Sequence, residues 1–287
     1  MKIIDVTVLY VDTLPAKIYL ALLKKNGYEP SRILFLNIES RSKIYRVAKG
    51  FMGHRIGRRL LSMYKRARSK NNDMSSELDV RWLKGCGLSL DDISNFFVTY
   101  PKNRIENVFV ESLGDERLVE YMKKEVQGAV LFTGGGILNQ EILSVPGIKF
   151  IHIHPGIVPD IRGADCFFWS YLLNGKAGYS VFYMNEGIDT GDVLYTQEVD
   201  VELKELCLQE VKNEEIYLSI LKYYDPALRI KMFIDLLDNE YKKLANAGKR
   251  VDLMNLDCQR QDESDGRMYF FMHENLRNFV IDKLKGA

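Results

Sequence analysis

Residues 151–193 read IHIHPGIVPDIRGADCFFWSYLLNGKAGYSVFYMNEGIDTGDV, and this stretch decides how the rest of the chain is interpreted. The mostly apolar run 148–154 has the length and composition of a buried strand. Side chains alternate along a strand, so His152 and His154 are predicted to project from the same face. A proline and a glycine then end the strand. Two titratable rings therefore lie at the carboxyl end of a predicted central strand, where open α/β sheets bind ligands.

An acidic loop, Gly187-Ile-Asp-Thr-Gly191, follows further along the chain. A predicted helix at Asp165–Leu173 and a predicted strand at Tyr179–Met184 can return the chain to the same end of the sheet. An aspartate there, Asp189, could orient an imidazole and raise its pKa, as a nearby opposite charge does. The alternatives are a plain hairpin turn built from Asp and Gly, and histidines that are merely hydrogen-bonded core residues.

Elsewhere the first 200 residues alternate apolar strand patterns with helical patterns. We predict an α/β fold with a doubly wound, mostly parallel sheet. The further strands are expected at Lys2–Tyr10, Arg32–Asn37, Asn95–Tyr100 and Gly128–Phe132, and the helices at Ala16–Lys25, Arg117–Glu125 and Asn139–Leu143.

The chain becomes helical and more polar after Asp200. Amphipathic helices are predicted at Leu208–Tyr224 and Ala227–Ala245, followed by a polar, turn-rich segment. The aromatic and apolar tail that begins at Met268 is expected to dock on the body, because exposing it to water would be costly. We therefore predict a catalytic domain at 1–200 and a smaller, mainly helical C-terminal extension at 201–287.

Composition narrows the class of protein. The 287 residues are 46% hydrophobic and 28% charged, as in a soluble globular protein with a sizeable core. The net charge is +1, from 40 basic and 39 acidic residues, so general nucleic-acid binding is not expected. No apolar run reaches the length of about 18 residues that a membrane span needs, and the first residues read as a strand rather than a signal peptide.

Four cysteines lie far apart, at 86, 166, 207 and 258, without a CxxC pair or a Cys/His cluster at zinc spacing. We expect reduced thiols in a cytoplasmic protein and no metal site.

The segment 41–70 carries many basic residues and no acid. It could be a solvated helical face, or a patch that meets a phosphate-bearing substrate or an anionic partner. The basic residues are Arg41, Lys43, Arg46, Lys49, Arg55, Arg58, Arg59, Lys65, Arg66, Arg68 and Lys70.

The opening stretch also resembles the family of N10-formyltetrahydrofolate-dependent formyltransferases, over about residues 80–200. The family pattern runs N-x-H-P-S/G-x-x-P-x-x-R-G, then a helix, a strand and D-x-G. His152 stands where the family has asparagine. The chain matches the pattern at His154, Pro155, Gly156, Pro159, Arg162, Gly163, Asp189 and Gly191.

The resemblance implies a Rossmann-like formyltransferase fold with N10-formyltetrahydrofolate as co-substrate. It implies that His154 and Asp189 are catalytic, with His152 at the position of the family amide. The loop in Val130–Leu138 is similar to the folate loop of the family. The implied cofactor-binding residues are Gly134, Gly135, Gly136, Ile137, Leu138, Gly187, Ile188 and Asp192, and the implied substrate-binding residues are Pro155, Gly156, Arg162 and Gly163.

In the family, an amine attacks the formyl carbon, and hydrogen-bond donors stabilise the oxyanion that develops. An imidazole N–H can donate as an amide does, so His152 is compatible with this chemistry. We therefore expect formyl transfer to a primary amine of a small molecule, such as a nucleotide-linked amino sugar, with a homodimer as one possible assembly. The alternatives are a catalytically silent ligand-binding module and a formyl-folate hydrolase.

Overall fold

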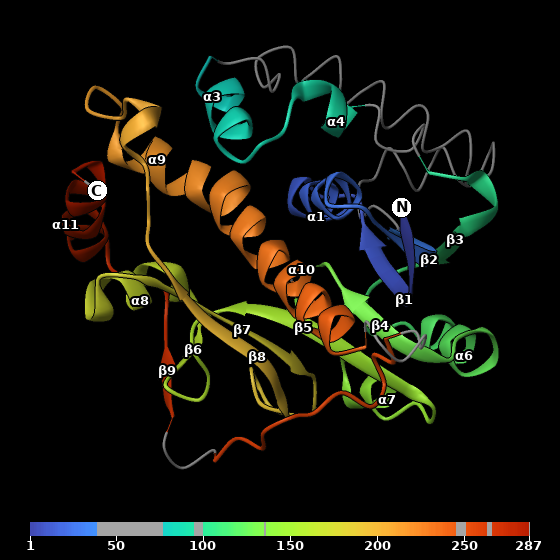
Figure 1. Cartoon of the computed structure of the whole chain (residues 1–287). Coiled ribbons are helices and arrows are strands. Elements are labelled where there is room, and N and C mark those ends of the chain that lie inside the picture. Colours follow the sequence, from blue (N-terminus) through green and yellow to red (C-terminus); the bar gives the residue numbers. More distant parts are fainter. Residues whose placement is uncertain (39–76, 95–99, 135, 245–250, 263–265, 287) are drawn as a thin grey trace.

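The computed structural model describes residues 1–38, 77–94, 100–134, 136–244, 251–262 and 266–286. Within them, a seven-stranded sheet has the order β3-β2-β1-β4-β5-β7-β8 (Figure 1). The first five strands in this order pair in parallel, whereas β7 pairs antiparallel with both β5 and β8. This arrangement confirms the predicted mostly parallel α/β sheet. The strands are β1 (Lys2–Val11), β2 (Tyr28–Ile38), β3 (Ile105–Val110), β4 (Gly128–Phe132), β5 (Ile148–Pro155), β7 (Ala177–Tyr183) and β8 (Val193–Val199).

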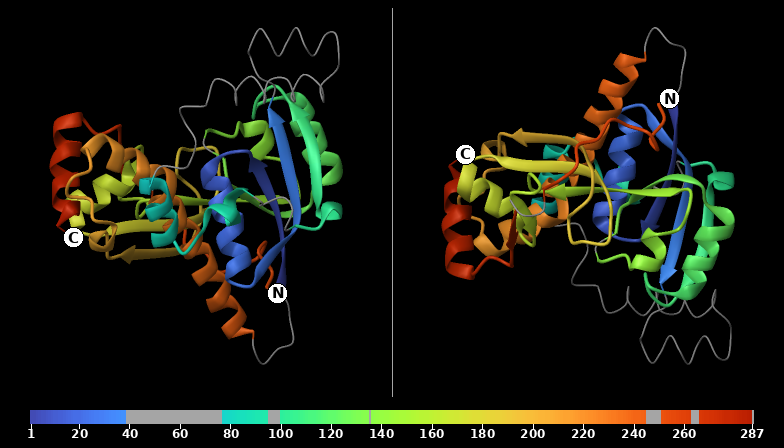
Figure 2. Two further views of the ribbon diagram at one scale, coloured as in Figure 1. Left: turned by 90° about the horizontal axis from the view of Figure 1, so that it is seen from above. Right: turned by 90° about the horizontal axis from the view of Figure 1, so that it is seen from below.

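Helices cover both faces of the sheet (Figures 1 and 2). Helices α1 (Leu14–Lys25) and α10 (Asp225–Lys243) pack on one face, while α6 (Glu116–Glu125) and α7 (Gln140–Leu143) pack on the other. Each face has its own cluster of buried apolar side chains. Strand β5 contributes to both clusters, because Ile151 and Ile153 join the α1/α10 cluster and Phe150 joins the α6/α7 cluster.

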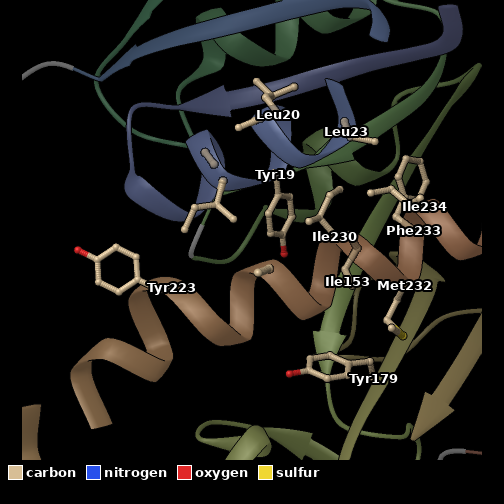
Figure 3. Close-up of a cluster of buried hydrophobic side chains, with 14 of the residues drawn as sticks. Tyr19, Leu20, Leu23, Ile153, Tyr179, Tyr223, Ile230, Met232, Phe233 and Ile234 are labelled. Atoms are coloured by element: carbon tan, nitrogen blue, oxygen red, sulfur yellow. The ribbon is translucent and has the colours of Figure 1, made fainter. Parts of the chain in front are cut away.

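The long helix α10 ties the end of the chain to its beginning. Its residues Ile230 and Phe233 are buried near Tyr19 of α1 and Ile153 of β5 (Figure 3). Residues beyond 200 thus help to cover the sheet that the first 200 residues form. The predicted boundary at residue 200 stays a prediction.

The two helices predicted after residue 207 form one nearly continuous rod. It comprises α9 (Asn213–Ser219), a π-helical turn η3 (Ile220–Tyr224) and α10. Pro226 lies in the first turn of α10, directly after the π-helical turn. The π turn before it keeps the rod continuous.

Strand β3 was not predicted, because its sequence IENVFV mixes polar and apolar residues. The predicted strand at Asn95–Tyr100 lies outside the described residues except for Tyr100, which is in a bend. The basic segment 41–70 also lies outside them. The remaining helices of this region are α3 (Glu77–Gly85), α4 (Leu90–Ser94) and η1 (Lys102–Arg104).

The tail docks on the body, as predicted. Strand β9 (Arg267–Tyr269) pairs with β6 (Ile161–Gly163), and α11 (Glu274–Lys285) packs against α8 (Cys166–Asn174) and α9. Phe270 and Phe271 nevertheless stay 77% and 79% exposed. A short helix, η2 (Lys204–Leu206), precedes α9. Among the described residues, no helix combines the length and apolar character needed to cross a membrane.

Candidate active site

The two histidines of β5 lie side by side, as the alternation of strand side chains predicted. Their ring centroids are 6.5 Å apart. The ring of His152 lies among aromatic neighbours, with Phe132 at 6.0 Å and Phe182 at 5.7 Å between centroids. His154 is 3% exposed, whereas His152 is partly exposed even though its Nδ1 is buried. Of the two residues, His152 is the less buried one.

Both ring nitrogens of His154 face oxygen atoms of the protein. Nε2 lies 3.2 Å from the carbonyl oxygen of Ile161, and Nδ1 lies 3.3 Å from Oδ1 of Asp189. A carbonyl oxygen only accepts hydrogen bonds, so Nε2 carries the hydrogen in this arrangement. In a neutral ring, the lone pair of Nδ1 therefore points at the carboxyl group of Asp189.

The loop between β7 and β8 carries Asp189 to this position. The two strands form the antiparallel pair that the hairpin interpretation anticipated, so hairpin and histidine contact occur together. Asp189 adopts a left-handed backbone conformation with φ of 54°. Its Oδ2 accepts a hydrogen bond of 2.9 Å from the backbone N–H of Gly163. The carboxyl group is thus held from the loop that follows β5.

A residue that the sequence did not single out also holds this loop. Nε2 of Gln261 donates to the carbonyl oxygens of Asp189, at 3.3 Å, and of Gly191, at 2.7 Å. Gln261 is 9% exposed and comes from the polar segment after α10. No local pattern marks it, because its partners lie about seventy positions earlier.

Burial dominates the protonation of these groups. It lowers the pKa of His152 and of His154 to about 3, with the Arg229 guanidinium of α10 acting in the same direction. It also raises the pKa of Asp189 above its usual value. Asp189 does act to raise the pKa of His152, as predicted, but desolvation of a buried cation outweighs it, so the expected net rise of the imidazole pKa does not occur. Both histidines are neutral near pH 7.

The predicted folate loop follows β4, which pairs directly with β5. Ile137 is 74% exposed and Leu138 is buried, while Gly135 lies outside the described residues. On the loop of Asp189, Ile188 is 51% exposed and Asp192 is exposed too. The predicted folate contacts thus include side chains that are open to the surface and lie on segments next to the histidines.

The predicted substrate-binding residues are less accessible. Pro155 and Gly156 are buried where β5 ends, and Arg162 is 8% exposed. Arg162 and Gly163 belong to β6, which pairs with β9 of the tail. A Cβ atom on Gly163 would lie 2.1 Å from the carbonyl oxygen of Tyr269, so glycine is needed for this pairing.

Residues 97–214 match the formyl transferase family model, a range that includes β5, His152, His154 and Asp189. The chain carries a formyltransferase-family domain. Methionyl-tRNA formyltransferase of Clostridium novyi is 42% identical over 69 residues, which are 23% of this chain and 22% of that protein. The enzyme of the same name from Clostridium tetani is 33% identical over 123 residues, or 42% of this chain and 39% of that protein.

The matched segments thus span well under half of these curated relatives. Among solved structures, a sugar N-formyltransferase from Shewanella has a TM-score of 0.44 and 16% identity over 96% of this chain and 85% of that one. A 4-N formyltransferase from Francisella tularensis has a TM-score of 0.43 and 14% identity over 92% of this chain and 75% of that one.

Proposed function

We propose that this chain transfers a formyl group from N10-formyltetrahydrofolate to a primary amine of a small molecule. The observation that carries the proposal is the contact between His154 and Asp189, in a formyltransferase-family domain, beside a histidine that reaches the surface. The folate would lie against the segment 134–138 and the residues 187, 188 and 192.

His152, His154 and Asp189 would have different roles in the transfer. His152 is the proposed donor to the oxyanion that forms when the amine attacks the formyl carbon, because it is the less buried residue of the two. His154 and Asp189 hold one proton between Nδ1 and Oδ1 and take part in moving the proton of the amine. Preorganised donors of this kind are worth about 3–4 kcal/mol each in other enzymes.

For the acceptor we propose a nucleotide-linked amino sugar. Two features support this acceptor: the residues after 200 are mainly helical, and the basic segment 41–70 could meet a phosphate-bearing substrate. The matched curated relatives bear the name of an enzyme that formylates methionyl-tRNA, so that RNA belongs in the same test. A cytoplasmic location is part of the proposal, and the four free cysteines suit a reducing compartment. A homodimer remains a prediction.

The test begins with calorimetry of the folded protein and a stable formyl-folate analogue. Absence of binding at millimolar ligand would refute the proposal. Turnover is then measured with N10-formyltetrahydrofolate and a panel of amines that includes nucleotide-linked 3- and 4-amino sugars and methionyl-tRNA. Formate release without an acceptor would indicate a hydrolase, and binding without turnover for any amine would indicate a silent module.

A further inference from the structure

Three ligand atoms converge at the candidate site. One nitrogen of His152, one nitrogen of His154 and one carboxyl oxygen of Asp189 all lie within 4.8 Å of one another. Within this group, Nδ1 of His154 and Oδ1 of Asp189 are 3.3 Å apart. If Nε2 of His154 donates to Ile161, these two atoms are both acceptors. Two acceptors at this distance need a cation between them, either a proton or a metal ion.

We propose that His152, His154 and Asp189 form a binding site for a divalent transition-metal ion, for which Zn²⁺ is the best fit. Imidazole and carboxylate are common zinc ligands, and three protein ligands plus one open position are typical of zinc sites that accept a water or a substrate. The inference rests on the same side chains as the proposed function, but it does not require that the protein use a folate. A bound ion would take the place of the proton between Nδ1 of His154 and Oδ1 of Asp189, so the proton-transfer roles proposed above apply to the metal-free protein.

The contacts behind the ligands are those of a metal site. A histidine that binds a metal usually donates its other N–H to a carbonyl or carboxyl oxygen, which fixes its tautomer. Nε2 of His154 has such a partner in Ile161, at 3.2 Å. Asp189 has its second oxygen occupied by the N–H of Gly163, at 2.9 Å. Each of these two residues therefore turns one free ligand atom toward the other.

The third ligand is the residue by which this chain departs from the family pattern. An asparagine at position 152 would offer only an amide, which is a poor ligand for zinc compared with imidazole. Nδ1 of His152 is buried and has no hydrogen-bond partner among the residues that the structure describes. Phe132 and Phe182 restrict its ring on two sides. Because His152 is only partly buried, we expect the open coordination position to lie on its side of the site.

No metal site was expected, because the cysteines and histidines of the chain do not have zinc-finger spacing. Here the spacing is set by the fold: β5 supplies two ligands at alternate positions, and the β7–β8 loop supplies the third. A formyl oxygen is a hard donor of the type that can complete such a site, so a metal ion and the formyl group would meet in the same place.

The test is zinc binding by the full chain without any folate. Protein that has been treated with EDTA and dialysed is titrated with Zn²⁺ in a calorimeter, and with Co²⁺ by visible absorption. We expect one ion per chain and the intense bands of four-coordinate cobalt. His152→Asn should bind at least about 10-fold more weakly, since even the loss of an outer partner has that effect. Circular dichroism and thermal unfolding show whether this variant is folded.

Two controls address other places where zinc could bind. His273 caps the N-terminus of α11 at the surface, and asparagine can cap a helix as well. The variant His273→Asn should therefore bind zinc with the same affinity as the wild-type protein. Replacing the exposed Cys207 and Cys258 by serine should also leave binding unchanged. Substoichiometric binding by wild-type protein, or equal affinity in folded His152→Asn, would overturn the metal site. Formyl transfer by EDTA-treated protein is assayed separately, so the two proposals can fail independently.

Discussion

Nδ1 of His154 lies 3.3 Å from Oδ1 of Asp189, although β6, α8 and β7 separate the two residues along the chain. Burial lowers the pKa of His154 and raises the pKa of Asp189, so it favours the neutral form of each group. The pair is therefore suited to hold and pass on a single proton.

Loss of either member of this pair should abolish most of the activity. We expect His154→Ala and Asp189→Asn each to reduce the rate of formyl transfer at least about 100-fold, since proton transfer and oxyanion stabilisation typically contribute about 10²–10⁴. The rate is measured by formation of tetrahydrofolate with saturating amine. Asp200→Asn removes an exposed carboxylate away from the pair and is the control. Near-normal turnover in either pair variant would show that the contact is structural.

His152→Asn should keep or raise transfer activity in EDTA-treated protein, because an amide donates a hydrogen bond as the imidazole does. His152→Ala should lose activity, since alanine has no donor and leaves a gap beside Phe132 and Phe182. The two variants are compared at saturating folate. If asparagine lowers the rate as far as alanine does, His152 has a role of its own, such as taking a proton from the amine.

The loop of Asp189 depends on a glycine. Gly191 has φ of +115°, and a Cβ atom there would lie 1.9 Å from the carbonyl oxygen of Tyr183. Gly175 also has positive φ, at +71°, but nothing lies within 4 Å of its Cβ position. We expect Gly175→Ala to cost about 1 kcal/mol from backbone strain alone. Gly191→Ala should cost about 1–3 kcal/mol more and should reduce turnover.

Urea unfolding of both glycine variants gives the comparison. If the two variants lose the same amount of unfolding free energy, the loop that carries Asp189 shifts freely to accommodate a methyl group. In that case the position of Asp189 is not tied to the backbone of Tyr183.

Gln261 should act as a positioning residue. Gln261→Ala removes two hydrogen bonds to loop carbonyls, which we expect to cost about 1–3 kcal/mol of stability. Because the loop carries Asp189, kcat should fall while KM for the amine changes less. Gln259→Ala alters a neighbouring glutamine that bonds to Val193 through its backbone, and it should leave kcat unchanged. A fall confined to KM would place Gln261 at the substrate instead.

Acid should destabilise the metal-free protein below about pH 6.5. The folded-state pKa of both histidines lies near 3, below the unfolded value of about 6.5, so their contribution is complete above pH 6.5 and is lost as the pH falls toward 3. Besides burial, His154, Arg229 and Asp189 act on the pKa of His152, and Arg229 and the carbonyl group of Ile161 act on the pKa of His154. The raised pKa of Asp189 has the opposite sign and offsets part of the loss at the acidic end.

The free energy of unfolding is measured in urea with EDTA present from pH 7 to 4.5. Each histidine contributes a slope of up to about 1.4 kcal/mol per pH unit, so His152→Asn should have a shallower acid limb than the wild type. Equal slopes would mean that water reaches His152 well enough to keep its pKa near the ordinary value.

Local patterns in the sequence were sufficient to predict much of the sheet and some of its helices. Strand β4 and helix α6 occur within one residue of their predicted bounds, because a short apolar run and an amphipathic repeat each specify their own backbone. The alternation rule also placed His152 and His154 on one face of β5. The order of the PG…RG and EGIDTG segments identified the Asp that meets His154.

Other features depend on contacts between distant residues, which no local pattern encodes. The mixed sequence of β3 becomes a strand because β2 offers an edge, and α10 covers the sheet because the α1/α10 cluster buries its apolar side. Gln261 reaches the active loop only after the chain has crossed the sheet. The sequence by itself determined which side chains meet at the end of β5. Their protonation depends on the folded structure, because desolvation results from everything packed around them and outweighs the effect of a single neighbouring charge.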